Sequence, residues 1–472
     1  MPKEMPKQIR FNAFTMNTVG HISPGMWTHP RDQSHRYTDI AHWAELARTL
    51  ERGKFDGVFI ADVLGIYDVY EGDRAHPIRH AIQVPVNDPM LIVPVMAAAT
   101  EHLGFGVTAS VSYEHPFPFA RRMSTLDHLT KGRIAWNIVT SYLDSGARAT
   151  GQQKLLDHDA RYDYAEEYAE ICYRLWEGSW DDDAVKRNKA SGVFADPAKV
   201  REIHFSGEHF TVDATHLSEP SPQRTPVLYQ AGASGRGRKF AARHAEAVFV
   251  GGPTKTILKG YVDSIRASAV EAGRAAADVQ IYNMHTLILG DTDAEAKRKH
   301  DEYRRHVDYA ASLTLLSGWM GIDLSKYDLD EPLRHVKTNA GQSAVESFSS
   351  ADPARTWTVR EIAEWVAIGG RGPISVGSPA TVADDLEQWM AETGVDGFNL
   401  GCAVMPETFT DIVDLLVPEL QRRGLYKREY APGTYREKLF GGGPRLAPTH
   451  PGAQWRAGGA DSQAPLRTRR AV

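Results

Sequence analysis

Several side chains that could do chemistry follow one buried strand, within residues 134–142. The apolar stretch IAWNIV is interrupted by Asn137, and Thr140, Ser141 and Tyr142 follow it directly. A buried amide without a hydrogen-bond partner costs about 1–3 kcal/mol, so Asn137 needs a partner. We therefore expect the carboxyl end of this strand to hold a polar partner or ligand.

Further candidate side chains follow the other expected strands, at the end where parallel barrels carry their active sites. They are Phe14, His21 in the loop after the first strand, Asp62, Thr108, Ser110 and the segment 231–234. This set lacks the paired carboxylates of a glycosidase and any HExxH or CxxC metal-ligand spacing. We expect no metal, and His21 taken alone could equally be an ordinary surface histidine.

A glycine-rich turn, QAGASGRG at residues 230–237, joins an expected strand to a helix. Glycines let the backbone approach a phosphate, and the free N–H groups of a helix N-terminus attract anions. Ser234 could cap this helix or contact the phosphate directly. The GxxGxG spacing is neither a dinucleotide fingerprint nor a P-loop, and a plain helix start explains it equally well.

His158 and Tyr162 are four residues apart at the start of a strong helical pattern. At this spacing both side chains lie on one helix face, where an imidazole and a phenol could donate to a phosphate. A helix cap beside a packed aromatic ring is the structural alternative.

Eight short apolar runs alternate with helical patterns and must position these residues. The expected strands are 9–14, 56–62, 104–112, 134–139, 226–232, 245–252, 279–290 and 397–403. Alternating strands and helices indicate an α/β protein with a parallel sheet. Eight such units predict a closed (β/α)8 TIM barrel, with a doubly wound open sheet as the alternative.

The barrel is expected to span residues 1–440 with two insertions. The first, about 181–225, should contain a hairpin at EIHFSGEHFTV; the second, about 291–395, holds a polar run at 336–357 that could be a lid. Residues 441–472 form a Gly/Pro-rich C-terminal extension, which we expect to be disordered or arm-like.

The composition is that of an ordinary globular chain of 472 residues, 42% hydrophobic, with a formal charge of −6. This charge gives no reason to expect nucleic acid or an anionic membrane as a partner. No apolar run approaches the ~20 residues that span a bilayer, and the N-terminus lacks a signal-peptide core. Cys172 and Cys402 cannot form a disulfide framework. We therefore expect a cytoplasmic protein.

Five stretches together resemble the bacterial-luciferase-like flavin monooxygenases. They are ARTLERGKFDGVFIAD, MSTLDHLTKGRIAWNIVTS, HDARYDYAEEY, SPQRTPVLYQAGASGRGRKFAARHAEAVF and DLLVPELQRRGLYKREY. The resemblance is to the subgroup of nitrilotriacetate, dibenzothiophene-sulfone and long-chain alkane monooxygenases, and NAFTMNTVGHISPGMWTHP and AIQVPVNDP look most like the alkane branch. It implies a (β/α)8 barrel, a homodimer or tetramer, and reduced FMN that a separate flavin reductase supplies for reaction with O2.

The resemblance also implies roles for individual residues. It places four residues along the flavin ring: Asp62, Thr108, Asn137 and Ser141. It places five at the ribityl chain and phosphate: His158, Tyr162, Ala231, Gly232 and Ser234. The reacting side would be lined by His21, Tyr67, Gln83 and Tyr142. Three residues depart from the alkane branch. Tyr142 stands in place of a His, Thr18 in place of a Cys, and Trp319 in a region where relatives carry a His.

These observations predict a two-component FMN-dependent monooxygenase. We expect a hydrophobic substrate, such as a long-chain alkane or an aromatic sulfone, because the pocket segments supply aromatic residues and Met but few basic residues. A polycarboxylate chelate would need Arg or Lys clamps. The alternatives are a deazaflavin-dependent dehydrogenase of the same superfamily and a non-catalytic flavin-binding protein.

Overall fold

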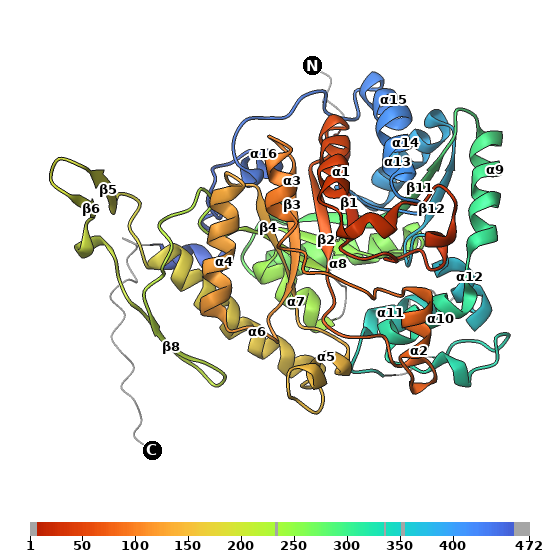
Figure 1. The fold of residues 1–472 in the computed structure, drawn as a ribbon, viewed down its shortest axis with the longest axis horizontal. Coiled ribbons are helices and arrows are strands. Elements are labelled where there is room, and N and C mark those ends of the chain that lie inside the picture. The colour runs from red at the N-terminus through yellow and green to blue at the C-terminus, as the bar shows by residue number, and fades with distance from the viewer. Residues whose placement is uncertain (1–6, 232–234, 335–336, 351–354, 457–472) are drawn as a thin grey trace.

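Eight parallel strands close into a barrel in the computed structural model, which describes residues 7–231, 235–334, 337–350 and 355–456 (Figure 1). Around the barrel they are β1 (Arg10–Met16), β2 (Gly57–Ala61), β3 (Gly104–Ser110), β4 (Ile134–Val139), β9 (Val227–Ala231), β10 (Ala247–Val250), β11 (Gln280–Leu289) and β13 (Gly397–Gly401), which pairs with β1. All eight predicted strands are confirmed with slightly shifted bounds, and so is the (β/α)8 fold.

Aromatic rings fill the interior of the barrel. Phe59 of β2 stacks on Tyr229 of β9 with ring centroids 5.8 Å apart, and Phe249 of β10 stacks on Tyr282 of β11 at 5.0 Å. Gly106 of β3 makes room for this packing, since a Cβ there would lie 2.4 Å from the Tyr229 ring. The filled interior leaves the strand ends as the place for a ligand.

The short helix α16 (Tyr435–Phe440) covers the amino ends of the strands. The buried Tyr435 hydroxyl donates to Asn12 Oδ1 at 3.3 Å and also bonds the Tyr229 hydroxyl. The buried Arg436 guanidinium pairs with Glu246 at 2.7 Å. The amino end is therefore closed by a packed polar network, and the carboxyl end remains for function.

Helices surround the barrel where amphipathic patterns predicted them. The first, α1 (Ile40–Arg52), ends at Gly53, and the Asp39 carboxylate accepts the Ala41 N–H at its start. The others beside the strands are α3 (Val93–Ala98), α4 (Pro116–Leu129), α5 (Asp144–Ala149), α6 (His158–Tyr173), α7 (Gly235–His244), α8 (Lys255–Glu271), α9 (Asp293–Tyr303), α13 (Pro379–Thr393), α14 (Glu407–Asp411) and α15 (Val417–Arg422). In the described part of the chain, no helix has the length and apolar character needed to cross a membrane.

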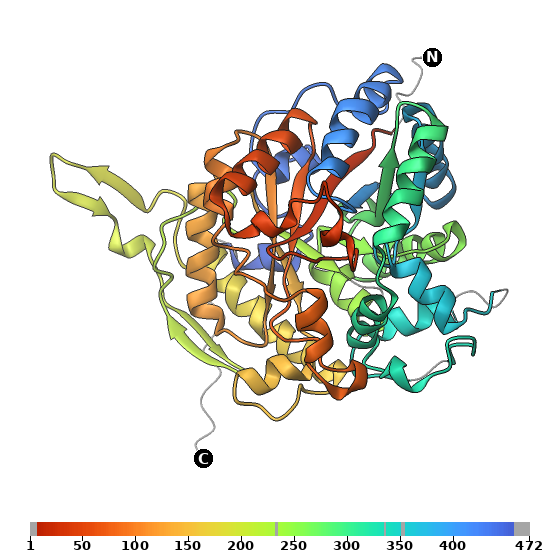
Figure 2. The same ribbon diagram turned by 45° about the vertical axis from the view of Figure 1, so that its right-hand side comes forward.

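The first insertion forms two antiparallel hairpins. One is β5 (Val185–Asn188) with β6 (Val193–Ala195), and the other is β7 (Ile203–Ser206) with β8 (Thr211–Ala214). The sequence predicted only the second of these. The β5–β6 hairpin extends away from the body in both ribbon views (Figure 1 and Figure 2).

The second insertion builds a helical cover beside the barrel. It holds α10 (Tyr309–Met320), α11 (Gln342–Ser349) and α12 (Val359–Val366), and α10 packs on α12 and on α2 (Ala75–His80) around an apolar core of its own. An unpredicted ninth strand, β12 (Ile374–Gly377), pairs with the end of β11. The helix α11 lies within the polar run that the sequence suggested as a lid.

The chain beyond α16 packs back onto the barrel as far as residue 456, rather than extending as an arm. His450 Nε2 lies 2.8 Å from the carbonyl oxygen of His244 in α7. Arg445 pairs with Glu177, a fully buried carboxylate after α6. The predicted arm-like extension is therefore wrong for residues 441–456, and residues 457–472 lie outside the described part.

Candidate active site

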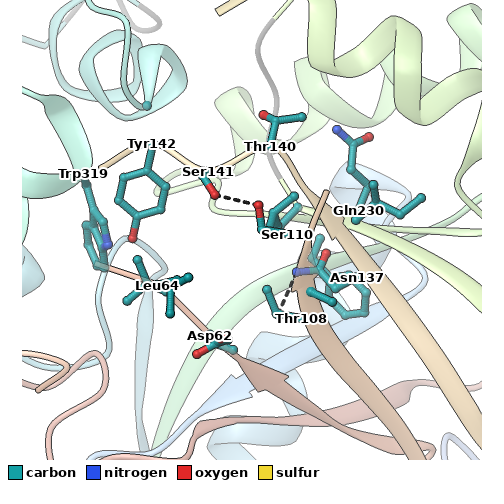
Figure 3. A pocket seen from close by; sticks show the side chains of 18 of the residues that line it. Asp62, Leu64, Thr108, Ser110, Asn137, Thr140, Ser141, Tyr142, Gln230 and Trp319 are labelled. Carbon is teal, nitrogen blue, oxygen red and sulfur yellow. Dashed lines mark hydrogen bonds between the residues drawn. The ribbon is translucent and has the colours of Figure 1, made fainter. Parts of the chain in front are cut away.

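A cavity of about 670 Å³ lies at the carboxyl ends of the barrel strands (Figure 3). The predicted site residues that line it are His21, Asp62, Gln83, Thr108, Asn137, Ser141, Tyr142, His158, Tyr162 and Ala231. Tyr67 does not line the cavity but lies behind its wall. Gly232 and Ser234 lie outside the described residues.

Two pairs of polar side chains connect the ends of β3 and β4. Asn137 Nδ2 donates to Thr108 Oγ1 at 2.9 Å, and Ser110 Oγ lies 2.7 Å from Ser141 Oγ (Figure 3). Within the described residues, Asn137 Oδ1 is buried without a hydrogen-bond partner. Ser141 has a φ of 63°, a left-handed conformation that is strained for serine and concentrated at functional sites. These strand ends therefore offer an acceptor and two hydroxyls to a ligand.

Asp62, at the end of β2, is a perturbed carboxyl group. Burial and the nearby Asp88 carboxylate raise the pKa of Asp62 to about 7. Near neutral pH it is therefore divided between an acid that donates a hydrogen bond and a carboxylate that only accepts. Such a group can match either a donor or an acceptor on the edge of a ring-shaped ligand.

Tyr142 begins a hydrogen-bonded chain that leads from the cavity wall into the protein. Its hydroxyl bonds the Tyr67 hydroxyl, Tyr67 bonds Gln83 Oε1 at 2.8 Å, and Gln83 Nε2 donates to the His21 carbonyl oxygen at 2.9 Å. Burial raises the pKa of Tyr142 to about 12, so its phenol keeps the proton at neutral pH. Because the single Tyr67 proton goes to Gln83, the Tyr142 hydroxyl donates to Tyr67 in this arrangement. The chain fixes the position of the Tyr142 oxygen at the cavity surface, and its proton reaches a ligand only by turning away from Tyr67.

The His21 imidazole faces the same cavity. Its ring meets Phe14 edge-on with centroids 4.5 Å apart. Burial lowers the pKa of His21 to about 3, so the ring is neutral, and Nδ1 is buried without a partner among the residues described. A neutral imidazole with an unused nitrogen can donate to or accept from a bound molecule.

The first turn of α6 supplies a cationic end of the cavity. His158 and Tyr162 share one helix face, as their spacing predicted, with ring centroids 5.3 Å apart. Arg161 lines the cavity as well and was missed, although its position three residues after His158 signals the same face. Arg161 donates to the carbonyl oxygens of Leu156 at 3.1 Å and Asn339 at 2.8 Å, but its Nε is buried with no partner in the described ranges. A phosphate suits this end of the cavity.

Residues far apart in the sequence complete the lining. They include Gln230 at the end of β9, Asn399 of β13, Trp319 of α10 and Arg371 in the loop before β12. Gln230 Oε1 and Asn399 Oδ1 are buried without partners in the part of the chain that the structure describes. Apart from Trp319, none of these residues was predicted individually as a site residue, because no local pattern points their side chains at the cavity.

These residues fit a flavin mononucleotide. The unpaired amide oxygens and Asp62 match the polar edge of an isoalloxazine ring, and the start of α6 offers donors to a phosphate. The cavity volume lies in the range of roughly 300–1,000 Å³ that is typical of small-molecule sites. Among the described residues, no group of three metal-ligating side chains lies close enough to hold an ion.

Comparison with known proteins shows the family of this chain. The family described as luciferase-like monooxygenase matches residues 21–397. The dimethyl-sulfide monooxygenase of Hyphomicrobium sulfonivorans is 50% identical over 96% of this chain and 94% of its own length. The long-chain alkane monooxygenase of Geobacillus thermodenitrificans is 49% identical over 96% of this chain and 99% of its own.

Solved structures give the same result. The structure of DmoA from Hyphomicrobium sulfonivorans matches with a TM-score of 0.89 at 49% identity, over 96% of this chain and 96% of its own. The structure of a long-chain alkane monooxygenase matches with the same TM-score and identity, over 96% of this chain and 100% of its own. A riboflavin lyase bound to a modified FMN matches with a TM-score of 0.90 at 36% identity, over 96% of this chain and all of its own. Two F420-dependent enzymes reach only 0.55 and 0.53 at 14% identity, which shows a shared fold alone.

The predicted resemblance is therefore confirmed, over nearly the whole chain. The alkane branch, however, is no more similar than the dimethyl-sulfide enzyme, since the two identities differ by one percentage point. The barrel, the polar strand ends and these relatives agree, and the chain belongs to the luciferase-like monooxygenase family as a flavin-dependent monooxygenase.

Proposed function

We propose that this protein is the oxygenase of a two-component system that uses reduced FMN and O2 to oxygenate a hydrophobic small molecule. A separate flavin reductase would supply the reduced FMN by transient transfer. One observation carries the proposal: a single cavity joins polar strand ends, a cationic first turn of α6, and an aromatic end at Tyr142 and Trp319 (Figure 3). Bound reduced flavin supplies the activation of O2, and the protein supplies position and environment.

The cofactor-facing residues divide into two groups. Asp62, Thr108, Asn137 and Ser141 would bind the flavin ring, with the unpaired Asn137 Oδ1 accepting a ring N–H. The ribityl chain and phosphate would lie against His158, Arg161, Tyr162, Ala231, Gly232 and Ser234. The phosphate would meet donors from the first turn of α6.

Tyr142 and His21 would act on the reacting side. Tyr142 holds a proton at neutral pH, and Tyr67 and Gln83 fix the position of its oxygen. Its O–H would turn from Tyr67 to donate a hydrogen bond where negative charge develops on a bound oxygen. The neutral His21 provides a second polar atom beside Phe14. The buried aromatic surroundings would limit water at the reacting atoms.

The substrate class is inferred from the lining and the relatives. Ile22, Leu64, Met90 and Met284 give the cavity apolar walls. Relatives are named for dimethyl sulfide, long-chain alkanes and, at 37% identity, dibenzothiophene sulfone. A hydrophobic carbon or sulfur compound fits both observations.

We further propose a cytoplasmic homodimer or tetramer. The two cysteines are unpaired, which suits a reducing compartment. Val193 and Phe194 on the projecting β5–β6 hairpin are exposed apolar side chains that a second subunit could cover. Light scattering of the purified protein measures the assembly directly.

The proposal is tested with purified protein, a flavin reductase, FMN or FAD, and a panel of alkanes, dialkyl sulfides and aromatic sulfones under ¹⁸O2. We expect one ¹⁸O atom in the product by mass spectrometry, and tighter binding of FMN than of FAD. Hydride transfer from a reduced deazaflavin without O2 uptake would support the dehydrogenase instead. Flavin binding with no turnover of either kind would support a binding protein.

A further inference from the structure

Arg371 lies in a loop that is wedged into the cavity wall. The loop, residues 367–373, joins α12 to β12, and Gly369 and Gly370 have φ of 79° and 71°. A Cβ at Gly372 would lie 2.1 Å from the carbonyl oxygen of Met284 in β11. Glycines therefore let this backbone touch β11 and hold the Arg371 side chain at the cavity.

Arg371 is bonded unlike the buried arginines elsewhere in the protein. Arg133 donates to five oxygens, four of them backbone carbonyls, and Arg436 pairs with Glu246. For Arg371 the described residues provide neither an ion pair nor a hydrogen bond to its guanidinium. Its partner there is the Trp319 ring, whose centroid lies 5.7 Å from Cζ.

A charge in this setting lacks compensation. Burial lowers the pKa of Arg371, so the cationic form is disfavoured relative to water. The nearby walls are Ile22, Met284 and the Trp319 ring, which a Cβ at Gly370 would meet at 3.3–3.4 Å. This end of the cavity thus combines a cation beside an aromatic ring with apolar surfaces.

Few basic residues line the cavity, as expected, but three of them are arginines: Arg122, Arg161 and Arg371. The two cations discussed here belong to different parts of the barrel. Arg161 lies on α6, which follows β4, whereas Arg371 packs against β11 and beside Gly251, which follows β10. If the flavin phosphate lies at the start of α6, the Arg371 end is left for another group.

We propose that Arg371 is a specificity-determining residue that binds an anionic oxygen group, a carboxylate or sulfonate, carried by an otherwise apolar substrate. This inference deepens the proposed function and rests on it for the identity of the site. A guanidinium that contacts an aromatic ring and has neither an ion pair nor a hydrogen bond within the described residues keeps its N–H groups for two parallel hydrogen bonds to such a group. The apolar part of the substrate would then lie along Ile22 and Met284.

The test compares binding of matched ligands to flavin-free protein by calorimetry. The probes are carboxylates and sulfonates with butyl, decyl and phenyl groups, each paired with the corresponding alcohol. The variants are Arg371→Met, Arg371→Lys and the control Arg355→Met, an exposed arginine 3.4 Å from the Trp357 ring in the same insertion. FMN affinity and thermal stability are measured for each variant.

In the parent protein we expect at least one anionic probe to bind more than tenfold tighter than its alcohol. Arg371→Met should remove that preference with alcohol binding within twofold, Arg371→Lys should keep part of it, and Arg355→Met should keep all of it. Equal anion binding in parent and Arg371→Met, or no anion preference in the parent, overturns the inference. A loss confined to FMN affinity also overturns it, since the anion is then the cofactor's.

The same measurements separate this inference from the proposed function. Binding of the probes needs neither reduced flavin nor O2, so a missing anion preference leaves oxygenation by the ¹⁸O2 assay untouched. Conversely, a protein that fails to use reduced FMN and O2 fails as an oxygenase whatever its anion preference. In turnover, Arg371→Met should raise KM for an anionic substrate more than it lowers kcat.

Discussion

Asp62 is a carboxyl group whose ionisation opposes folding. Its pKa is about 7 in the folded protein, because of burial and Asp88, and about 3.9 in an unfolded chain. The stabilising contribution of the protonated form is therefore complete below pH about 4 and is lost as pH rises through about 7. The Asp62→Asn side chain cannot ionise. Its free energy of unfolding, relative to that of the parent protein, should therefore rise by more than about 1 kcal/mol from pH 4 to pH 8.

Thermal unfolding of parent and Asp62→Asn across that pH range measures this difference. Asp88→Asn is the matched control. With the neighbouring charge gone, the pKa of Asp62 should fall. In that background, the further substitution Asp62→Asn should then change the pH dependence of stability by a smaller amount. Parallel stability curves for the parent and Asp62→Asn would show that Asp62 ionises as it does in water.

Tyr142 tests the proton donor on the reacting side. Tyr142→Phe keeps the ring packed beside Trp319 but removes the hydroxyl that bonds Tyr67. We expect unchanged FMN affinity, product formation lower by on the order of 10²-fold, and more hydrogen peroxide released per O2 consumed. Tyr67→Phe should have a weaker effect, because it removes only the support behind the donor. Normal coupling in Tyr142→Phe would assign the residue to packing and leave His21 as the candidate.

Residue types at strand ends were predictable, but their neighbours across the barrel were not. Asp62 follows an apolar run, and Thr108 and Asn137 lie within theirs toward the carboxyl end, so the strand pattern alone places all three at the same end of the barrel. Arg371 comes from a glycine-rich loop inside a long insertion, and only its wedging against β11 brings it to the cavity. Tyr67 was expected on the reacting side, but it lies one layer behind Tyr142.

At the scale of elements, the first turn of α6 both contacts the second insertion and lines the cavity. Arg161 ties the helix to the second insertion through the Asn339 carbonyl oxygen at 2.8 Å, and it also faces the cavity. Arg161→Met should weaken FMN binding about 10- to 100-fold, since one hydrogen bond to a charged group contributes roughly 1.5–3 kcal/mol. Arg161→Lys should lose less, and Arg121→Met on the exposed face of α4 should lose nothing.

Fluorescence titration with FMN and with riboflavin separates the phosphate from the ring. If Arg161 binds the phosphate, Arg161→Met affects FMN and leaves riboflavin affinity unchanged. A similar loss for both flavins would place its contribution at the ring or in the fold of the insertion.

Long amphipathic elements were predictable, and short paired ones were not. The helix α1 has an apolar face and a clear stop at Gly53. The strand β12 has four residues that alternate between buried and half-buried, and β5 and β6 are even more exposed. Such strands depend on a partner strand rather than on their own pattern, so the sequence gives little sign of them.

At the scale of the whole molecule, late parts of the chain hold the barrel at the amino ends of its strands and along two of its outer helices. The helix α16 closes the amino ends through Tyr435 and Arg436, and the segment up to residue 456 packs over α6 and α7. This second contact joins residues more than 200 positions apart, such as His244 and His450. The C-terminal segment is therefore part of the folded body, although its Gly/Pro-rich composition suggested otherwise.

Arg445 and Glu177 provide the test of this closure. Glu177 is fully buried, and its carboxylate pairs with Arg445 and accepts a hydrogen bond from Thr225 at 2.7 Å. Removing one partner of a buried ion pair typically costs about 3–5 kcal/mol, because the other charge is left uncompensated. Since Arg445 is itself partly exposed and Arg456 Nε lies 3.6 Å from the same carboxylate, the loss should be smaller than for an isolated buried pair. We expect Arg445→Met to lower the free energy of unfolding by about 2 kcal/mol, measured by denaturant unfolding. Adding Glu177→Gln to the Arg445→Met variant should recover much of this loss. The control Arg187→Met breaks an exposed ion pair with Glu219, so its free energy of unfolding should stay within about 1 kcal/mol of that of the parent. Equal stabilities of Arg445→Met and the parent would mean that the segment packs on the barrel without stabilising it.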